Sequence, residues 1–249
     1  MNKKILITGA AGFLGSKYCS YLIKKKYSLI AIDIDEVGLA KLNRFGGKNI
    51  LTVKIDITNK IELKELEEVL LKKKIFISSI INNAAIDSVP GKSKEFKSIK
   101  KELEVSLEGS DNIIKMFLPK KKIGKKLKKI INIGSDLSVI APDQRIYKKV
   151  YKNFIKPSSY SIIKHGMVGL TKYYAAFLAK DGIAVNMISP GPIFNNHKKQ
   201  FVKNIINLIP HGRMGIPKDI FPVLDLLLDD RSEYITGQNI LIDGGRSII

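Results

Sequence analysis

The sequence predicts an α/β fold in which a doubly wound parallel sheet of about seven strands carries helices on both faces. Two observations lead to this prediction. Short, continuous, β-branched apolar runs alternate with helical patterns along the chain, and a glycine-rich turn follows the first run. Such alternation is typical of right-handed βαβ units. Because 249 residues suffice for one core of this class, we expect a single domain over residues 1–249.

The expected strands are short runs rich in Ile, Leu and Val, as fully buried parallel strands should be. They lie at Ile5–Thr8, Leu29–Asp33, Leu51–Ile55, Ser79–Asn82, Ile130–Gly134, Ala184–Ser189 and Ile240–Ile242. Helices are expected between them, at Gly12–Lys26, Ile61–Lys72, Glu95–Leu118, Ser158–Ala179 and Lys218–Leu228.

Residues 137–157, called the excursion below, fit this alternation poorly. They are polar, basic and aromatic, and Pro142 and Pro157 break regular structure. The excursion follows the carboxyl end of an expected strand, where open α/β sheets bind their ligands. We therefore expect it to lie near the active site.

The formal net charge of +20 permits two interpretations. One is a polyanionic partner, such as nucleic acid or an anionic membrane surface. The other is a compositional preference for Lys together with Ile and Asn, since only five of the 43 basic residues are Arg, which nucleic-acid sites use for bidentate contacts. The second interpretation is favoured, so we expect no nucleic-acid partner.

Membrane and redox signals point to a cytoplasmic protein. No apolar stretch approaches the roughly 20 residues that cross a bilayer. Cys19 is the single cysteine, so no intrachain disulfide can form, which suits a reducing compartment. The three histidines are scattered without metal-ligand spacing, and no metal site is expected.

The segment Thr8-Gly9-Ala10-Ala11-Gly12-Phe13-Leu14-Gly15 follows the first strand and opens the first helix. Glycines are needed where such a turn is tight and where the backbone approaches a pyrophosphate, which the helix N-terminus then binds. The pattern alone is weak, but its place between a strand and a helix indicates a Rossmann-type dinucleotide site. The candidate cofactor contacts are Gly9, Gly12, Phe13, Leu14 and Gly15.

Asp33 ends the second expected strand, 18 residues beyond Gly15. An acidic side chain there accepts both ribose hydroxyls of NAD and repels the 2′-phosphate of NADP. The alternative is that Asp33 only caps the next helix. Asp35 is a weaker candidate for the ribose because it lies past the strand end. We expect NAD as the cofactor.

Tyr160 and Lys164 stand four residues apart on an expected helix and so share one face. A phenol with a pKa of about 10 is a poor acid–base catalyst at neutral pH, and a neighbouring ammonium favours its phenolate form. The pair alone is weak evidence, because Tyr160 could simply pack in the core while Lys164 is solvated.

Further motifs make the sequence resemble the short-chain dehydrogenase/reductase superfamily from Ile5 to the C-terminus. They are Asn82-Asn83-Ala84-Ala85, Ile131-Asn132-Ile133-Gly134-Ser135, Val185-Asn186, Ser189-Pro190-Gly191, and Thr236-Gly237 with Asp243-Gly244-Gly245. Taken together, motifs at these positions are far more specific than any one of them.

The resemblance implies roles for individual residues. Ser135 would hydrogen-bond the substrate oxygen, Tyr160 would be the general acid/base, and Lys164 would lower the pKa of Tyr160 and bind the nicotinamide ribose. Ser106 stands where many members have an asparagine that supports the lysine and a relay water, and a serine reaches less far. Further cofactor contacts would be Asp56, Ile57, Asn83, Ala84, Pro190, Gly191 and Ile193. For Asp56 the alternative is a turn residue before Thr58.

The excursion and the tail Ile242-Asp243-Gly244-Gly245-Arg246-Ser247 resemble oxidoreductases of bacterial surface-sugar and flagellin-glycan pathways, which make nonulosonic acids and amino sugars. The resemblance implies an NAD(H)-dependent interconversion of a secondary alcohol and a ketone on a sugar-like, anionic substrate. The glycine spacing instead follows the extended branch, so an NAD-retaining epimerase or dehydratase is an alternative. A degenerate, non-catalytic binding protein is another.

Two expectations concern the surroundings of the site. Arg145 and Lys149 of the excursion would hold the substrate anion, with Tyr147 and Tyr151 against its sugar face. The alternative is a solvated loop or an oligomer contact. The helices expected at Glu95–Leu118 and Ser158–Ala179 would form a homotetramer or homodimer, because their apolar faces need cover.

Overall fold

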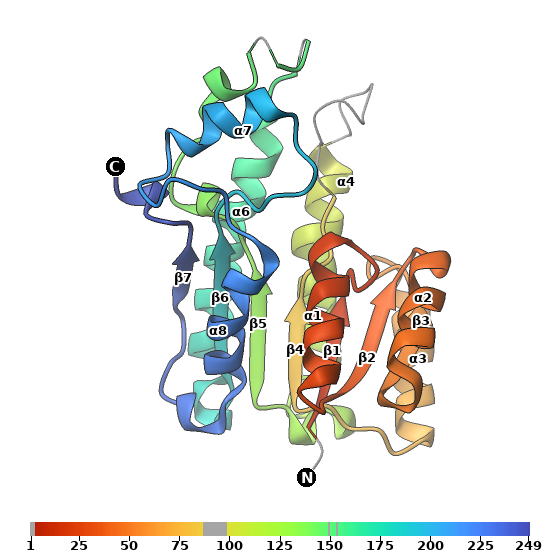
Figure 1. The fold of residues 1–249 in the computed structure, drawn as a ribbon. Helices are drawn as coiled ribbons and strands as arrows, with labels where there is room; N and C mark the ends of the chain where they lie inside the picture. Colours follow the sequence, from red (N-terminus) through yellow and green to blue (C-terminus); the bar gives the residue numbers. More distant parts are fainter. Residues whose placement is uncertain (1–2, 87–98, 149, 153) are drawn as a thin grey trace.

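Seven parallel strands form one sheet in the order β3-β2-β1-β4-β5-β6-β7 (Figure 1), which confirms the predicted fold class. This computed structural model describes residues 3–86, 99–148, 150–152 and 154–249. The strands are β1 Lys4–Thr8, β2 Ser28–Asp33, β3 Ile50–Lys54, β4 Ser79–Asn82, β5 Lys129–Ile133, β6 Ala184–Pro190 and β7 Asn239–Ile242.

Helices cover both faces of the sheet (Figure 1). They are α1 Phe13–Lys24, α2 Glu36–Gly46, α3 Lys60–Lys72, α4 Ile99–Leu103, α5 Gly109–Met116, α6 Ser158–Leu178, α7 Lys199–Ile206 and α8 Pro217–Leu228. A π-helical turn, Glu104–Glu108, joins α4 to α5. Residues 95–98 of the helix predicted to begin at Glu95 lie outside the described residues.

The core consists of two apolar layers because successive strand residues point to opposite faces. Leu6 of β1 packs in the layer that α3, α5 and α6 cover, and its neighbours Ile5 and Ile7 pack in the layer that α1, α2 and α8 cover. All three side chains are fully buried. Strands covered on both faces can be apolar throughout, which explains the continuous Ile-rich runs.

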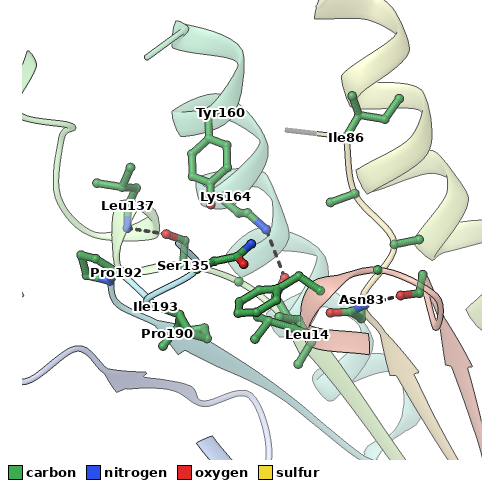
Figure 2. A pocket seen from close by; sticks show the side chains of 18 of the residues that line it. Leu14, Asn83, Ile86, Ser135, Leu137, Tyr160, Lys164, Pro190, Pro192 and Ile193 are labelled. Carbon is green, nitrogen blue, oxygen red and sulfur yellow. Dashed lines mark hydrogen bonds between the residues drawn. The ribbon is translucent and has the colours of Figure 1, made fainter. Parts of the chain in front are cut away.

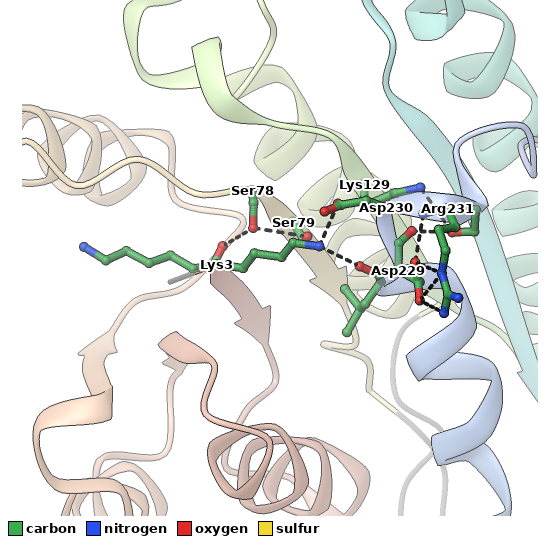
Figure 3. A network of polar contacts seen from close by, with 10 residues as sticks. Lys3, Ser78, Ser79, Lys129, Asp229, Asp230 and Arg231 are labelled. Carbon is green, nitrogen blue, oxygen red and sulfur yellow. Dashed lines mark hydrogen bonds and ion pairs between the residues drawn. The ribbon is translucent and has the colours of Figure 1, made fainter. Parts of the chain in front are cut away.

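Polar contacts join the amino-terminal ends of the strands, the edge opposite the ligand-binding edge (Figure 3). Lys3 pairs with Asp230 at 2.6 Å, and the buried Lys129 donates from Nζ to Ser232 Oγ at 3.1 Å. Burial lowers the pKa of Lys129. These contacts tie β1 and β5 to the segment between α8 and β7. These contacts stabilise the sheet at the edge opposite the ligand-binding edge.

The strand order shows where a ligand-binding crevice is expected. β1 pairs with β2 on one side and with β4 on the other, so the strand order reverses beside β1. Ligands of open α/β sheets bind at the carboxyl ends of strands at such a reversal. Within residues 3–86, 99–148, 150–152 and 154–249, no helix is long and apolar enough to cross a membrane.

Candidate functional site

A cavity of about 750 Å³ opens at the carboxyl ends of the strands. The glycine turn and Asp33 line one end of the cavity, and the excursion, α7 and the C-terminal segment line the other. Ser135, Tyr160 and Lys164 line the same cavity. The structure therefore brings the predicted cofactor turn and the predicted catalytic residues to one cavity.

Glycine is required at two positions of the turn. Gly9 has a φ of +62°, and a Cβ there would lie 2.7 Å from the Cα of Ala84. A Cβ at Gly15 would lie 2.0 Å from the carbonyl oxygen of Gly9. Gly15 is buried beneath the turn, whereas Gly12, Phe13 and Leu14 line the cavity. Gly15 thus lets the turn pack closely, and the exposed backbone at Gly12 is where a phosphate could approach.

Asn83 fastens the glycine turn to the end of β4. Its Nδ2 donates to the carbonyl oxygens of Thr8 at 3.2 Å and Gly9 at 2.9 Å. In return, Thr8 Oγ1 accepts the backbone N–H groups of Asn83 and Ala84, each at 3.1 Å. Asn83 and Ala84 also line the cavity. Asn83 therefore shapes the turn in addition to facing any ligand in it.

Asp33 lies at the carboxyl end of β2 and faces the same cavity. Its Oδ2 accepts the N–H of Ala11 at 2.8 Å, and its Oδ1 accepts the N–H of Asp35 at 3.0 Å. The cap of α2 is Asp35, which accepts the N–H of Gly38. Capping of the helix, the alternative considered for Asp33, therefore belongs to Asp35.

The remaining predicted cofactor contacts follow strand ends. Pro190, Gly191 and Ile193 line the cavity after β6, and Asp56 and Ile57 line it after β3. Asp56 Oδ1 also accepts the N–H and the hydroxyl of Thr58, at 2.9 and 2.8 Å. The turn role considered for Asp56 is confirmed, and contact with a cofactor stays a prediction.

Ser135, Tyr160 and Lys164 meet on one wall of the cavity (Figure 2). Ser135 follows β5, while Tyr160 and Lys164 lie one turn apart in α6. The buried Lys164 donates from Nζ to the carbonyl oxygen of Ile133 at 3.3 Å, and the same Nζ lies 5.5 Å from the ring centroid of Tyr160. A phenol, a hydroxyl and an ammonium so placed can exchange a proton with a substrate oxygen.

The Ser135 hydroxyl contacts a buried ion pair. Its Oγ donates to Asp136 Oδ1 at 2.9 Å and accepts the N–H of Leu137 at 3.2 Å. Asp136 also forms an ion pair with Arg246, and the two side chains are 3% and 6% exposed. Burial raises the pKa of Asp136, against the effect of Arg246. Arg246 belongs to the C-terminal motif quoted from the sequence, but neither Arg246 nor Asp136 was predicted to have a role.

Ser106 lies in the π-helical turn between α4 and α5. Its side chain is buried, and Val105 rather than Ser106 lines the cavity. Within the described residues, Ser106 Oγ has no hydrogen-bond partner. Ser106 therefore does not line the cavity itself, because the backbone turns this side chain into the protein. Support of Lys164 through a water stays a prediction.

The excursion folds back onto α7. Ile146 and Tyr147 pack with Phe201 and Ile205 in a small apolar cluster, and the rings of Tyr147 and Phe201 lie 5.5 Å apart. Tyr147 and Tyr151 line the cavity. This packing places the excursion at the cavity, and its contact with a substrate stays a prediction. The same cluster buries the apolar face of α7, which stabilises that helix in this position.

Arg145 is a correction to the sequence analysis. Its side chain is 84% exposed, and its guanidinium pairs with Asp143 at 2.7 Å. It lines a separate depression with Lys148, outside the main cavity. The physical reason is local: Asp143 caps the short 3₁₀ turn Gln144–Ile146 and draws the guanidinium back onto itself. Lys149, the other predicted substrate cation, lies outside the described residues.

Lys156, which sequence reasoning missed, brings a cation from the excursion to the cavity. The residue is 8% exposed, and its Nζ lies 3.7 Å from the ring centroid of Tyr160. The sequence feature that could have indicated Lys156 is its position four residues before Tyr160 and next to Pro157.

Comparison with known proteins identifies the family. The profile of a family described as enoyl-(acyl carrier protein) reductase matches residues 9–247. The chain belongs to the short-chain dehydrogenase/reductase superfamily. Membership makes it an oxidoreductase, as the motifs predicted.

Three proteins similar to this chain differ in the functions by which they are described. The chain is 30% identical to the 3-oxoacyl-[acyl-carrier-protein] reductase of Thermotoga maritima, over 98% of this chain and 97% of the other. It is also 30% identical to post-translational flagellin modification protein A of Campylobacter coli, over 98% of both chains. A short-chain dehydrogenase from Leptospira borgpetersenii, solved with bound NAD⁺, matches with a TM-score of 0.87 and 33% identity, covering 99% of this chain and 93% of that one.

Proposed function

We propose that this protein is an NAD(H)-dependent oxidoreductase that interconverts a secondary alcohol and a ketone on a sugar-like, anionic substrate in surface glycan biosynthesis. The observation that carries the proposal is the meeting of Ser135, Tyr160 and Lys164 in a cavity that also contains the glycine turn and Asp33.

The cofactor end fits NAD. Gly9 and Gly15 pack too tightly for any Cβ, and the exposed Gly12 between them leaves the backbone of the turn accessible to a pyrophosphate. The Asp33 carboxylate suits ribose hydroxyls and would repel a 2′-phosphate. When bound, NAD accepts or supplies the hydride. The Leptospira relative with NAD⁺ supports this assignment.

The catalytic wall supplies the proton. Tyr160 would exchange a proton with the substrate oxygen, and Ser135 would hydrogen-bond the same oxygen. The charge of Lys164, held by the carbonyl of Ile133, favours the phenolate form of Tyr160. When a ketone is reduced, the phenol gives its proton to the new alkoxide; when an alcohol is oxidised, the phenolate takes the hydroxyl proton.

The substrate end suits a sugar with an anionic group. Tyr147 and Tyr151 offer flat rings, and Lys156 offers a buried cation. Arg246 is already neutralised by Asp136. The similarity to flagellin modification protein A favours a surface-glycan substrate. The acyl-carrier-protein reductases, at equal identity, favour a 3-oxoacyl thioester instead.

A substrate panel read by NADH absorbance tests the proposal. It contains nucleotide-linked 4-keto sugars, phosphorylated ketoses and, as the rival class, acetoacetyl thioesters of coenzyme A and acyl carrier protein. We expect kcat/KM on the best sugar to exceed that on either thioester by about tenfold or more, roughly 1.4 kcal/mol in barrier height.

Two results would contradict the proposal. A higher kcat/KM on the thioesters would make the protein an acyl reductase. Conversion of a sugar without any net change in NADH would make it an NAD-retaining epimerase or dehydratase. Product analysis of each sugar by NMR separates the second result from simple inactivity.

A further inference from the structure

Two hydrogen bonds join Gln144 to Lys156 within the excursion, and this pair of bonds is called the clamp below. Gln144 Nε2 donates to the carbonyl oxygen of Lys156 at 3.0 Å, and the backbone N–H of Lys156 donates to Gln144 Oε1 at 3.0 Å. The two residues are 12 positions apart. A side-chain amide that satisfies both backbone groups of one residue fixes that backbone, so the clamp sets the position of Lys156.

The clamp holds Lys156 directly before the helix that carries Tyr160. Pro157 is the N-cap of α6, and the N–H of Tyr160 donates to its carbonyl oxygen at 3.2 Å. Lys156 Nζ then lies 3.7 Å from the ring centroid of Tyr160, closer than the 5.5 Å of Lys164 Nζ. Two ammonium groups therefore lie within cation–π range of one phenol ring.

We propose that Lys156 is a second cation of the catalytic centre, which stabilises the phenolate of Tyr160 together with Lys164. The negative charge of a phenolate spreads into its ring, so a cation over the ring face attracts the anion more than the neutral phenol. Both residues line the cavity wall, where low polarity strengthens such attraction. The inference rests on the proposed role of Tyr160 as acid–base catalyst.

Among the residues that the structure describes, the other charged groups near this wall do not replace Lys156. Asp136 is neutralised by Arg246, and Lys101 of α4 is exposed to solvent. Burial lowers the pKa of His197, so its ring is uncharged where a phenol titrates. Lys164 and Lys156 are thus the cations nearest the phenol among the described residues.

A substrate-free titration of Tyr160 tests the proposal. The near-ultraviolet absorbance of phenolate is recorded against pH for the wild type and for Tyr160→Phe, and the difference isolates Tyr160. The same subtraction is made in a Lys156→Met background. We expect Lys156→Met to raise the midpoint by about one pH unit, equivalent to about 1.4 kcal/mol.

Three further variants make the test specific. Lys156→Arg keeps the cation and should restore the midpoint to within about 0.3 units. Lys152→Met removes an exposed lysine of the same excursion and should leave the midpoint unchanged. Gln144→Ala keeps Lys156 but releases the clamp, so it should raise the midpoint partway. This last variant tests the proposal even if Lys156→Met does not fold.

The proposal is wrong if Lys156→Met and Gln144→Ala both keep the wild-type midpoint. It is also wrong if Lys156→Met raises the KM for an anionic ketone while the midpoint of Tyr160 keeps its wild-type value, because Lys156 would then act on the substrate alone. Failure of the proposed function looks different. In that case no sugar ketone is turned over by the wild type, while the midpoint of Tyr160 still shifts with Lys156.

Discussion

The carboxylate of Asp136 and the guanidinium of Arg246 form a buried ion pair that links the C-terminal segment to the catalytic centre. Asp136 also accepts the hydroxyl of Ser135 at 2.9 Å. The buried carboxylate of Asp136 therefore binds both the catalytic candidate Ser135 and Arg246 of the C-terminal segment. The orientation of Ser135 depends on this pair.

Arg246→Met should destabilise the protein because it leaves the carboxylate of Asp136 buried and unpaired. Loss of one partner of such a pair costs about 3–5 kcal/mol, which urea unfolding measures. The control is Arg231→Met, since Arg231 pairs with Asp229 on the surface and should change the free energy of unfolding by less than about 1 kcal/mol. Asp136→Asn combined with Arg246→Met should recover much of the loss. Equal effects of the two single arginine variants would show that the buried pair adds no more stability than the surface pair.

Asp33 should make the protein select NAD(H) over NADP(H). The carboxylate lies at the cavity with its Oδ2 on the N–H of Ala11, where a 2′-phosphate would meet a negative charge. Titration of both cofactors by fluorescence should give at least about tenfold tighter binding of NADH. Asp33→Ala should narrow the gap. Tighter binding of NADPH by the wild type would refute the assignment.

Arg145→Ala should leave KM for an anionic substrate within about twofold of wild type. From the sequence, Arg145 was expected to hold the substrate anion, but its guanidinium is paired with Asp143 outside the cavity. Steady-state kinetics on the best ketone of the substrate panel provide the measurement. A several-fold rise in KM without loss of stability would mean that the excursion closes further over bound substrate.

The exposed face of α6 should be covered by a second copy of the chain. Tyr173 and Phe177 are 61% and 55% exposed, and their rings are stacked at 5.9 Å. Exposed aromatic pairs are typical of protein interfaces. Light scattering should give a dimer or tetramer at micromolar concentration, and Tyr173→Asp combined with Phe177→Asp should weaken it. Lys172→Ala serves as an exposed control on the same helix. A monomeric wild type would contradict the prediction.

The sequence predicted the sheet well because each buried strand is a continuous apolar run. The bounds of β4 match the prediction, and the other strands differ by one residue at one or both ends. Two helices of the described residues were missed. α2 contains Gly38, which weakens its helical pattern. α7 is short, but its apolar residues Phe201, Val202, Ile205 and Ile206 recur at helical spacing, so a local signal was present and was overlooked.

The candidate site was also predicted in part: its cofactor and catalytic residues were found from the sequence, and its substrate end was found less well. Gly9, Asp33, Ser135, Tyr160 and Lys164 belong to regular motifs, and the structure brings them to one cavity or beneath it. The substrate end was predicted less well, because the pairing of Arg145 with Asp143 and the burial of Lys156 depend on how the excursion folds. In a basic loop, sequence shows how many cations are present but not which of them face the cavity.

The most direct measurement is the turnover of Tyr160→Phe beside its affinity for NAD. This variant removes only the hydroxyl that would carry the proton, so the cavity and the glycine turn stay intact. On the best ketone of the panel, we expect kcat to fall by at least about 100-fold, while the Kd for NAD changes by less than about threefold. If Tyr160→Phe kept more than about a tenth of the wild-type rate, the barrier would have risen by less than roughly 1.4 kcal/mol, and Tyr160 would not be the acid–base catalyst.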